Sequence, residues 1–133
     1  MNTLKLEVVT PERKVFDEEV NLVIAKGSDG ELGILPNHIP LVTPLRVAPL
    51  RYKQGEATHT IAVHGGFVEI RGDKVVVLAE AAEFPDQIDL ARAENAKQRA
   101  EDRINANDDH TDTLRAEMAL KRALNRIEVA NIK

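Results

Sequence analysis

The first part of the chain alternates apolar and polar side chains with the two-residue period of β-strands. Leu4, Leu6 and Val8 are separated by charged residues, so one face of this segment is apolar. Residues 22–25 and 75–79 form short apolar runs, which also favour strands. Several short strands are therefore expected before residue 85.

Turns with glycine separate these strand-like segments. The stretches QGE at 54–56 and RGDK at 71–74 lie between apolar runs, where glycine can supply the positive φ of a tight hairpin. Short strands joined by such turns predict an antiparallel β-sandwich or a barrel.

Glycine and proline are confined to this part of the chain. All seven glycines lie between Gly27 and Gly72, and all six prolines lie between Pro11 and Pro85. Because glycine and proline favour turns and interrupt regular helices and strands, the absence of both after Pro85 indicates a change of architecture there. We predict a β domain over residues 1–85 and a helical segment over residues 86–133.

After Pro85 the apolar positions recur with helical spacing. One stripe contains Ala93, Ala96, Ala100 and Ile104, and a second contains Ala116, Ala119, Ala123, Ile127 and Ala130. The stretch NANDDH at 105–110 interrupts the pattern and has the usual length of a helix connection. The pattern predicts an antiparallel two-helix hairpin that begins at Asp86 or Gln87, with Asp86 as N-cap and Asp89 in the first turn.

The alanine stripes let two helices approach closely but bury little apolar surface. Burial stabilises by about 25 cal/mol per Å², whereas ordering costs about 1.5 kcal/mol per residue. We therefore expect the hairpin to need a second surface or a ligand, and to be a movable element.

Composition excludes several classes of function. The formal charge of −4 and the aromatic content of 3% argue against nucleic acid as a partner. The chain has no cysteine, and it has no apolar run of the length that a membrane span needs. We expect a soluble chain that docks on other proteins, including those of a membrane complex.

Catalytic motifs are absent from the sequence. The four histidines are scattered without a metal-ligand spacing, Ser28 is the single serine, and the glycine clusters lack the features of a phosphate loop. An enzyme that uses His38 or His64 would lack a partnered nucleophile or a metal site, and we disfavour it.

Arginine is the residue type with a suggestive arrangement. Arg92 and Arg99 lie two turns apart on the first predicted helix, and Arg122 and Arg126 lie one turn apart on the second. Antiparallel pairing about Asp108 sets Arg92 opposite the other pair, where guanidinium groups would crowd and favour a phosphate ligand. The alternative is a solvated face whose arginines are balanced by neighbouring acids such as Glu94 and Glu117.

Four motifs resemble one known family. They are GELGILPNHIPLVTPL at 30–45, VTP at 9–11, AVHGGFVEI at 62–70 and VVVLAEAAE at 75–83. By these motifs the chain is identified as a member of the epsilon subunits of rotary proton-translocating (F-type) ATP synthases, of the bacterial ATP-binding type. The resemblance covers essentially the whole chain and implies a β-sandwich followed by a helical hairpin in a non-catalytic subunit.

The resemblance also implies a nucleotide site. Residues 88–93, IDLARA, match the I/L-D-x-x-R-A motif with which bacterial members bind ATP as a regulatory ligand. The implied contacts are Glu83, Ile88, Asp89, Arg92, Ala93, Arg99, Arg122 and Arg126, with no catalytic cofactor. The expectation is that ATP holds the hairpin folded, and that its loss frees the helices to inhibit ATP hydrolysis.

The resemblance finally implies partners and a location. The sandwich is expected to dock on the gamma subunit and the c-ring, with Glu31 and His38 in the contact stretch. The extended hairpin is expected to approach the alpha and beta subunits through basic residues such as Arg115, on the cytoplasmic face of the cell membrane. The alternative is a purely structural coupling subunit whose hairpin only packs on the sandwich.

Overall fold

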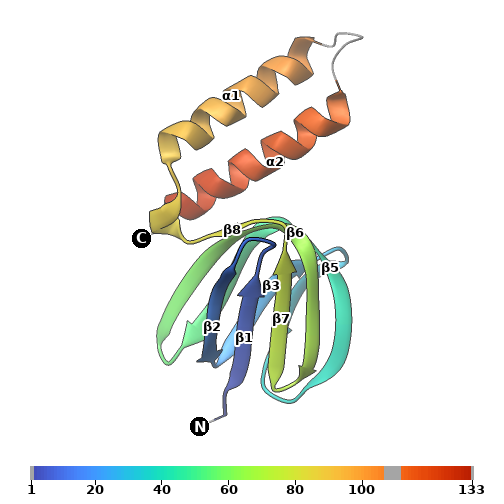
Figure 1. Ribbon diagram of the computed structural model, residues 1–133, viewed down its shortest axis with the longest axis vertical. Coiled ribbons are helices and arrows are strands. Elements are labelled where there is room, and N and C mark those ends of the chain that lie inside the picture. The colour runs from blue at the N-terminus through green and yellow to red at the C-terminus, as the bar shows by residue number, and fades with distance from the viewer. Residues whose placement is uncertain (1, 107–111, 133) are drawn as a thin grey trace.

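The computed structural model describes residues 2–106 and 112–132, and it divides into a β-sandwich and two helices (Figure 1). The elements in chain order are β1 (Leu4–Val9), β2 (Lys14–Val20), β3 (Leu22–Gly27), β4 (Gly30–Ile34), β5 (His38–Gln54), β6 (Ala57–Gly72), β7 (Lys74–Ala79), β8 (Ala82–Glu83), the 3-10 turn η1 (Pro85–Gln87), α1 (Leu90–Ala106) and α2 (Thr113–Ala130). The predicted sandwich and helical hairpin are thus confirmed.

The strands form one continuous hydrogen-bonded path in the order β2-β1-β7-β6-β5-β3-β4, with β8 paired to β6. The 17-residue β5 and the 16-residue β6 are long enough to run through both layers of the sandwich. All pairs are antiparallel except β1 with β7, which is parallel. Sequence periodicity did not reveal this one exception, because it carries no information on which strands become neighbours.

Gly65 and Gly66 mark the point where β6 changes partner. Residues 66–71 of β6 pair with β7, whereas residues 62–63 pair with β8. Both glycines have positive φ, 78° and 123°, a region in which other residues are strained. The pair therefore forms a corner within one strand.

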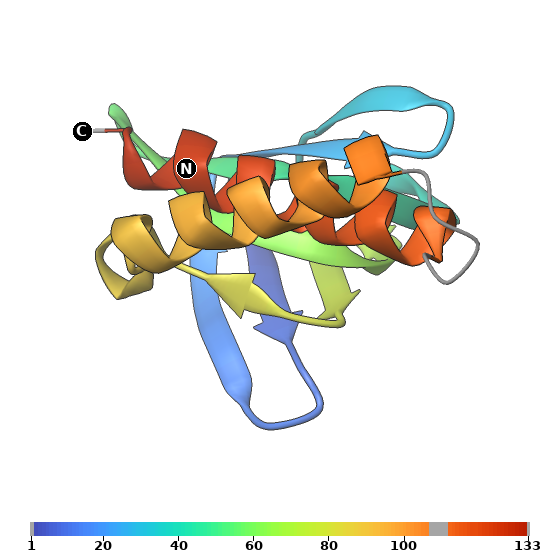
Figure 2. The same cartoon turned by 90° about the horizontal axis from the view of Figure 1, so that it is seen from above.

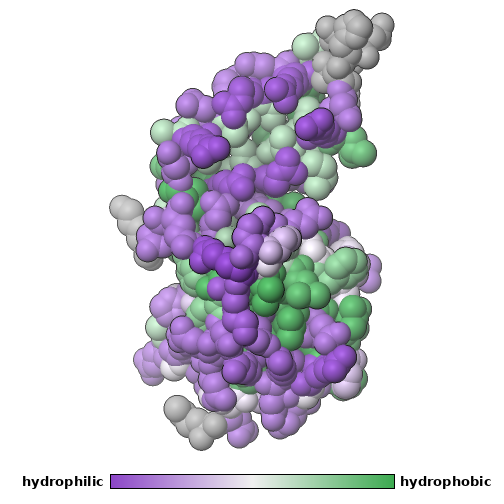
Figure 3. Space-filling view, in the orientation of Figure 1, coloured by the Kyte–Doolittle hydropathy of each residue, from purple (hydrophilic) through white to green (hydrophobic). Residues whose placement is uncertain are grey.

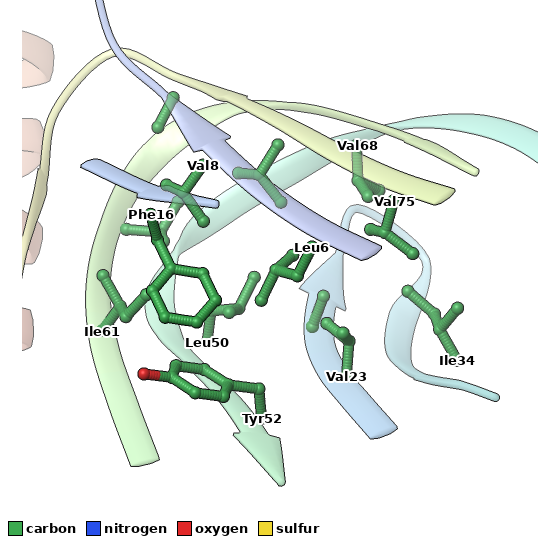
Figure 4. Packing of buried hydrophobic residues seen from close by; sticks show 14 of the residues in the cluster. Leu6, Val8, Phe16, Val23, Ile34, Leu50, Tyr52, Ile61, Val68 and Val75 are labelled. Carbon is green, nitrogen blue, oxygen red and sulfur yellow. The ribbon is translucent and has the colours of Figure 1, made fainter. Parts of the chain in front are cut away.

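The core fills the space between the two layers, and all eight strands contribute side chains to it. Leu6, Phe16, Leu50, Ile61 and Val75 point into it from five different strands (Figure 4). Every residue of this cluster, and every apolar residue packed against it, precedes Pro85. The helices contribute nothing to it, so the sandwich has a complete core of its own.

The hairpin lies at the end of the sandwich opposite the N-terminus, and α2 lies between α1 and the strands (Figure 1). In the view from above α1 lies in front of α2, and the two helices run along each other in contact (Figure 2). Ala93 and Ala100 of α1 and Ala116 and Ala123 of α2 are buried, as the alanine stripes predicted. No described helix is long and apolar enough to cross a membrane.

The first helix begins later than the sequence suggested. Asp86 belongs to the turn η1, Ile88 is extended with φ −91° and ψ 126°, and α1 starts at Leu90. The backbone N–H of Arg92 donates to Asp89 Oδ1 at 3.1 Å, so Asp89 and not Asp86 caps the helix. The prediction of a start at 86 or 87 was wrong because proline and Gln87 close a separate turn there.

The second helix begins with a cap of the same kind. Asp112 precedes α2, and its Oδ1 accepts a hydrogen bond from the backbone N–H of Arg115 at 3.0 Å. The break was predicted at 105–110. Its first two residues, Asn105 and Ala106, belong to α1, and residues 107–110 lie outside the described ranges.

Candidate functional site

A cavity of about 400 Å³ lies where the two helices meet the end of the sandwich. It is lined by Glu83, Gln87, Asp89, Arg92, Ala93, Ala96, Arg99 and Arg126. Six of the eight residues that the sequence placed in a nucleotide site are therefore brought together. They come from three elements and their connections, so the cavity exists only when the hairpin is folded against the sandwich.

The α1 wall of the cavity follows from helical spacing. Arg92 and Arg99 are two turns apart, and Ala93 and Ala96 between them are small enough to leave space. Asp89 enters the same wall as the helix cap. Among the described residues, the guanidinium groups of Arg92 and Arg99 have no ion-pair partner, which leaves both available to an anion.

The opposite wall is a single ion pair between the hairpin and the sandwich. Arg126 of α2 donates from Nε to Glu83 Oε1 of β8 at 2.6 Å, and both side chains are partly buried. Bonds of this kind between two charged groups are stronger than neutral ones. The pair joins the last strand to the last helix.

Glu83 also contacts His64, which is 1% exposed on β6. His64 Nε2 lies 3.2 Å from the same Glu83 Oε1, and His64 Nδ1 lies 3.4 Å from Nδ2 of Asn125 on α2. Burial first, and then the charge of Arg126, lower the pKa of His64 from 6.5 to about 4. The imidazole is therefore neutral at pH 7.

Two predicted nucleotide contacts lie elsewhere. Ile88 is half-buried in the extended link between η1 and α1, next to the cavity but not lining it. Arg122 lines a larger cleft of about 810 Å³ between α2 and strands β5 and β6. Four residues advance a helix by a full turn and only about 40° more, so Arg122 and Arg126 are neighbours on one face of α2, although they line different cavities.

The expected partner contacts are separated on the surface. Arg51 Nη2 lies 3.5 Å from Glu31 Oε1 on β4, whereas His38 begins β5 opposite Gly72. His38 Nδ1 lies 2.7 Å from the carbonyl oxygen of Ile39. Arg115 is exposed in the first turn of α2.

Several residues of the site were missed by sequence reasoning. Ala96 had a usable signal, because it lies between Arg92 and Arg99 on the same predicted helix face. Gln87 had none, and its side-chain oxygen accepts from the backbone N–H of Phe84 at 3.0 Å. His64 and Asn125 meet across 61 positions of sequence, and no local pattern links them.

The cavity suits a phosphorylated ligand. Three guanidinium groups face two carboxylates, which leaves an excess of positive charge, and guanidinium forks match phosphate oxygens. Within the part of the chain that the structure describes, no three histidine or carboxylate side chains come together as metal ligands would.

Comparison with protein families gives matches along almost the whole chain. Residues 3–85 match the family model "ATP synthase, Delta/Epsilon chain, beta-sandwich domain", and residues 86–131 match "ATP synthase, Delta/Epsilon chain, long alpha-helix domain". The two matches meet at the position where glycine and proline end.

Individual relatives are similar over their full lengths. The ATP synthase epsilon chain of Desulforamulus reducens is 54% identical over 128 residues, covering 96% of this chain and 97% of the relative. That of Bacillus cytotoxicus is 50% identical over 133 residues and covers 100% of both. A chain in the cryo-EM structure of the Euglena gracilis mitochondrial ATP synthase has a TM-score of 0.83 at 20% identity, covering 98% of this chain and 82% of that one, and supports the fold alone.

Proposed function

The chain belongs to the family of ATP synthase delta/epsilon chains, and from this premise we propose that its hairpin is an ATP-responsive switch on a non-catalytic rotor subunit. The enzymatic activity belongs to the complex and not to this subunit. The sandwich attaches the chain to the rotor, and residues 86–133 regulate ATP hydrolysis.

The observation that carries the proposal is the composition of the 400 Å³ cavity. Arg92 and Arg99 come from α1, Arg126 from α2, and Glu83 from the end of the sandwich. A ligand that contacts all of them binds only the folded form. At about ten times its Kd, such a ligand stabilises that form by about 1.4 kcal/mol, enough to move a balanced switch.

Each residue has a defined part in the proposed site. Arg92, Arg99 and Arg126 hold the phosphates, while Glu83, Ile88, Asp89 and Ala93 hold the nucleoside. Arg122 joins the phosphates only if its side chain turns from the larger cleft toward Arg126, one turn further along α2.

Low ATP favours the opposite state in this proposal. The ligand-free helices leave the sandwich, extend along the gamma subunit and approach the alpha and beta subunits. The alanine seam supports this, because α2 is held by little buried apolar area. Arg115, Arg122 and Arg126 are the basic residues offered to those subunits.

An apolar surface supports attachment through the sandwich. Val42, Phe67 and Leu78 are 63%, 53% and 54% exposed on three neighbouring strands. Figure 3 shows an apolar area on this side of the sandwich, over β6 and β7. Exposed patches of this kind mark protein interfaces. We assign it to the contact with the gamma subunit and the c-ring, and we propose that the chain lies at the cytoplasmic face of the bacterial membrane as part of that complex.

Calorimetric titration of the isolated chain with ATP tests the switch. We expect binding, and we expect Arg92→Ala to weaken it about tenfold or more, because a bond to a charged group contributes about 1.5–3 kcal/mol. Arg115→Ala is the matched control, since Arg115 lies outside the cavity. Absence of binding at millimolar ATP, or equal affinity of the Arg92→Ala variant, would remove nucleotide sensing from the proposal.

A structural coupling role is the second candidate. It is favoured by the Arg126–Glu83 pair and the Asn125–Val63 hydrogen bond, which hold the hairpin on the sandwich without any ligand. Reassembly of the complex with a chain that ends at Pro85 separates the two functions. Faster ATP hydrolysis supports regulation, and unchanged hydrolysis with intact coupling supports the structural role.

A further inference from the structure

A chain of four side chains links the cavity to the contact between α2 and the sandwich. Arg126 Nε donates to Glu83 Oε1 at 2.6 Å, His64 Nε2 lies 3.2 Å from that oxygen, and Asn125 lies behind His64. Asn125 Nδ2 also donates to the carbonyl oxygen of Val63 at 3.0 Å. The two end residues, Arg126 and Asn125, come from α2, and the two residues between them come from strands β8 and β6.

The hydrogen-bond partners define the tautomer of His64. Glu83 is an acceptor, so Nε2 carries the proton, and Nδ1 is left to accept from the amide of Asn125. The two amide hydrogens of Asn125 are then used on His64 and Val63. Asn125 is 5% exposed, and its Oδ1 has no partner among the described residues, so this side chain is held by its amide hydrogens alone.

We propose that His64 and Asn125 are positioning residues that orient Arg126 for a phosphate ligand and at the same time hold α2 on β6. The inference rests on the function proposed for the cavity. It makes ligand binding and hairpin docking one equilibrium, because the same four side chains serve both.

The geometry explains how orientation passes along the chain. Glu83 accepts the Nε–H of Arg126, which leaves the terminal nitrogens of that guanidinium for an anion in the cavity. His64 holds Glu83 in place, and Asn125 holds His64. Residues behind a binding site act in this way by fixing the groups that touch the ligand.

The charges around His64 add a dependence on pH. Burial disfavours protonation of His64 most, Arg126 and Arg122 of α2 disfavour it further, and Glu83 of β8 favours it. The cleft beside it contains the further charged residues Lys26, Arg46, Glu80, Lys121 and Glu128. The folded pKa, about 4, lies below the ordinary 6.5, so docking is fully stabilised above pH 6.5 and weakens as the pH falls toward 4.

The test uses the full chain with ATP as the probe, at pH 7.5. Loss of the orienting bond in His64→Leu or Asn125→Leu is expected to weaken ATP binding about tenfold. His64→Gln is expected to stay within about threefold of wild type, because its amide can donate to Glu83 as Nε2 does. His59→Gln is the matched control, since His59 is exposed on the same strand.

Docking is measured separately, without ligand, as hydrogen-exchange protection factors of α2 at pH 7.5 and 5.5. Protection of α2 relative to the strands is expected to fall at pH 5.5 in the wild type and in His59→Gln, and to be independent of pH in His64→Gln. In Asn125→Leu, the protection of α2 is expected to be lost at both pH 7.5 and pH 5.5. Asn125 lies outside the sandwich core, so this variant leaves the strands folded.

The outcomes separate this inference from the proposed function. Equal ATP affinity of the wild type, His64→Leu and Asn125→Leu overturns the positioning role and leaves nucleotide sensing intact. Equal pH dependence in the wild type and His64→Gln also overturns it. Failure of the wild type to bind ATP overturns the proposed function and the positioning role together.

Discussion

At the scale of single residues, Gly66 is the glycine with the least space for a side chain. Its φ is 123°, and an added Cβ would lie 2.0 Å from the carbonyl oxygen of Leu78 and 2.9 Å from Ala79 Cα. Both are backbone atoms, which cannot rotate away. Gly66→Ala is expected to destabilise the sandwich by about 3 kcal/mol or more, measured by urea unfolding.

The control for this change is Gly33→Ala. Nothing lies within 4 Å of a Cβ built at Gly33, and its φ is outside the positive region. We expect its free energy of unfolding to change by about 1 kcal/mol or less. Comparable losses for both variants would contradict the packing that we describe around Gly66.

Tyr52 gives a second prediction at this scale. It is the single tyrosine, it is buried beside Phe16 with ring centroids 4.6 Å apart, and burial raises its pKa to about 12. Its contribution to stability is present below the unfolded pKa of about 10 and is lost as the pH rises through about 12. Absorbance at high pH should show a midpoint near 12 in the folded chain and near 10 in urea.

At the scale of elements, the helix pair depends on its alanine seam. Ala100 is 2% exposed on α1, which has α2 as its main neighbour. Ala100→Leu is expected to force the helices apart at a cost of about 1–3 kcal/mol. Hydrogen exchange should become faster in α1 and α2 and stay unchanged in the strands.

Ala91→Leu is the matched control for the seam. Ala91 lies on the exposed face of the same helix, so the added side chain enters solvent. Equal effects of the two substitutions would show that helix propensity, and not packing, explains the change.

At the scale of the whole molecule, the two parts differ in how they are stabilised. The sandwich has its own core, whereas the hairpin relies on alanines, one ion pair and the buried amide of Asn125. A part held by few contacts opens at lower free energy than a packed core. A hairpin that opens more easily than the sandwich can change conformation while the sandwich stays folded, as the proposed switch requires.

Truncation after Pro85 tests this division. The shortened chain keeps Phe84, which packs against the core, and loses the cover that α2 provides over β5 and β6, where Ala62 and His64 are buried. We expect cooperative unfolding with a free energy lower by about 2 kcal/mol or less. A truncated chain without a cooperative transition would contradict an independent sandwich.

Much of this architecture was determined by the sequence alone. The change from a two-residue period to a helical one, together with the loss of glycine and proline after Pro85, predicted the sandwich and the hairpin. The motif at 88–93 and the spacing of Arg92 and Arg99 predicted half of the residues that line the cavity. These signals are local, since they depend on backbone preferences and on which face of one element is apolar.

Only the tertiary structure decided how the elements meet. It paired β1 with β7 in parallel, and it placed Arg99 and not Arg122 in the lining of the cavity that contains Arg126. It also brought His64 to Asn125 and Glu83. Such contacts depend on how whole elements pack against one another, and side chains that are far apart in the sequence leave no periodic trace of meeting.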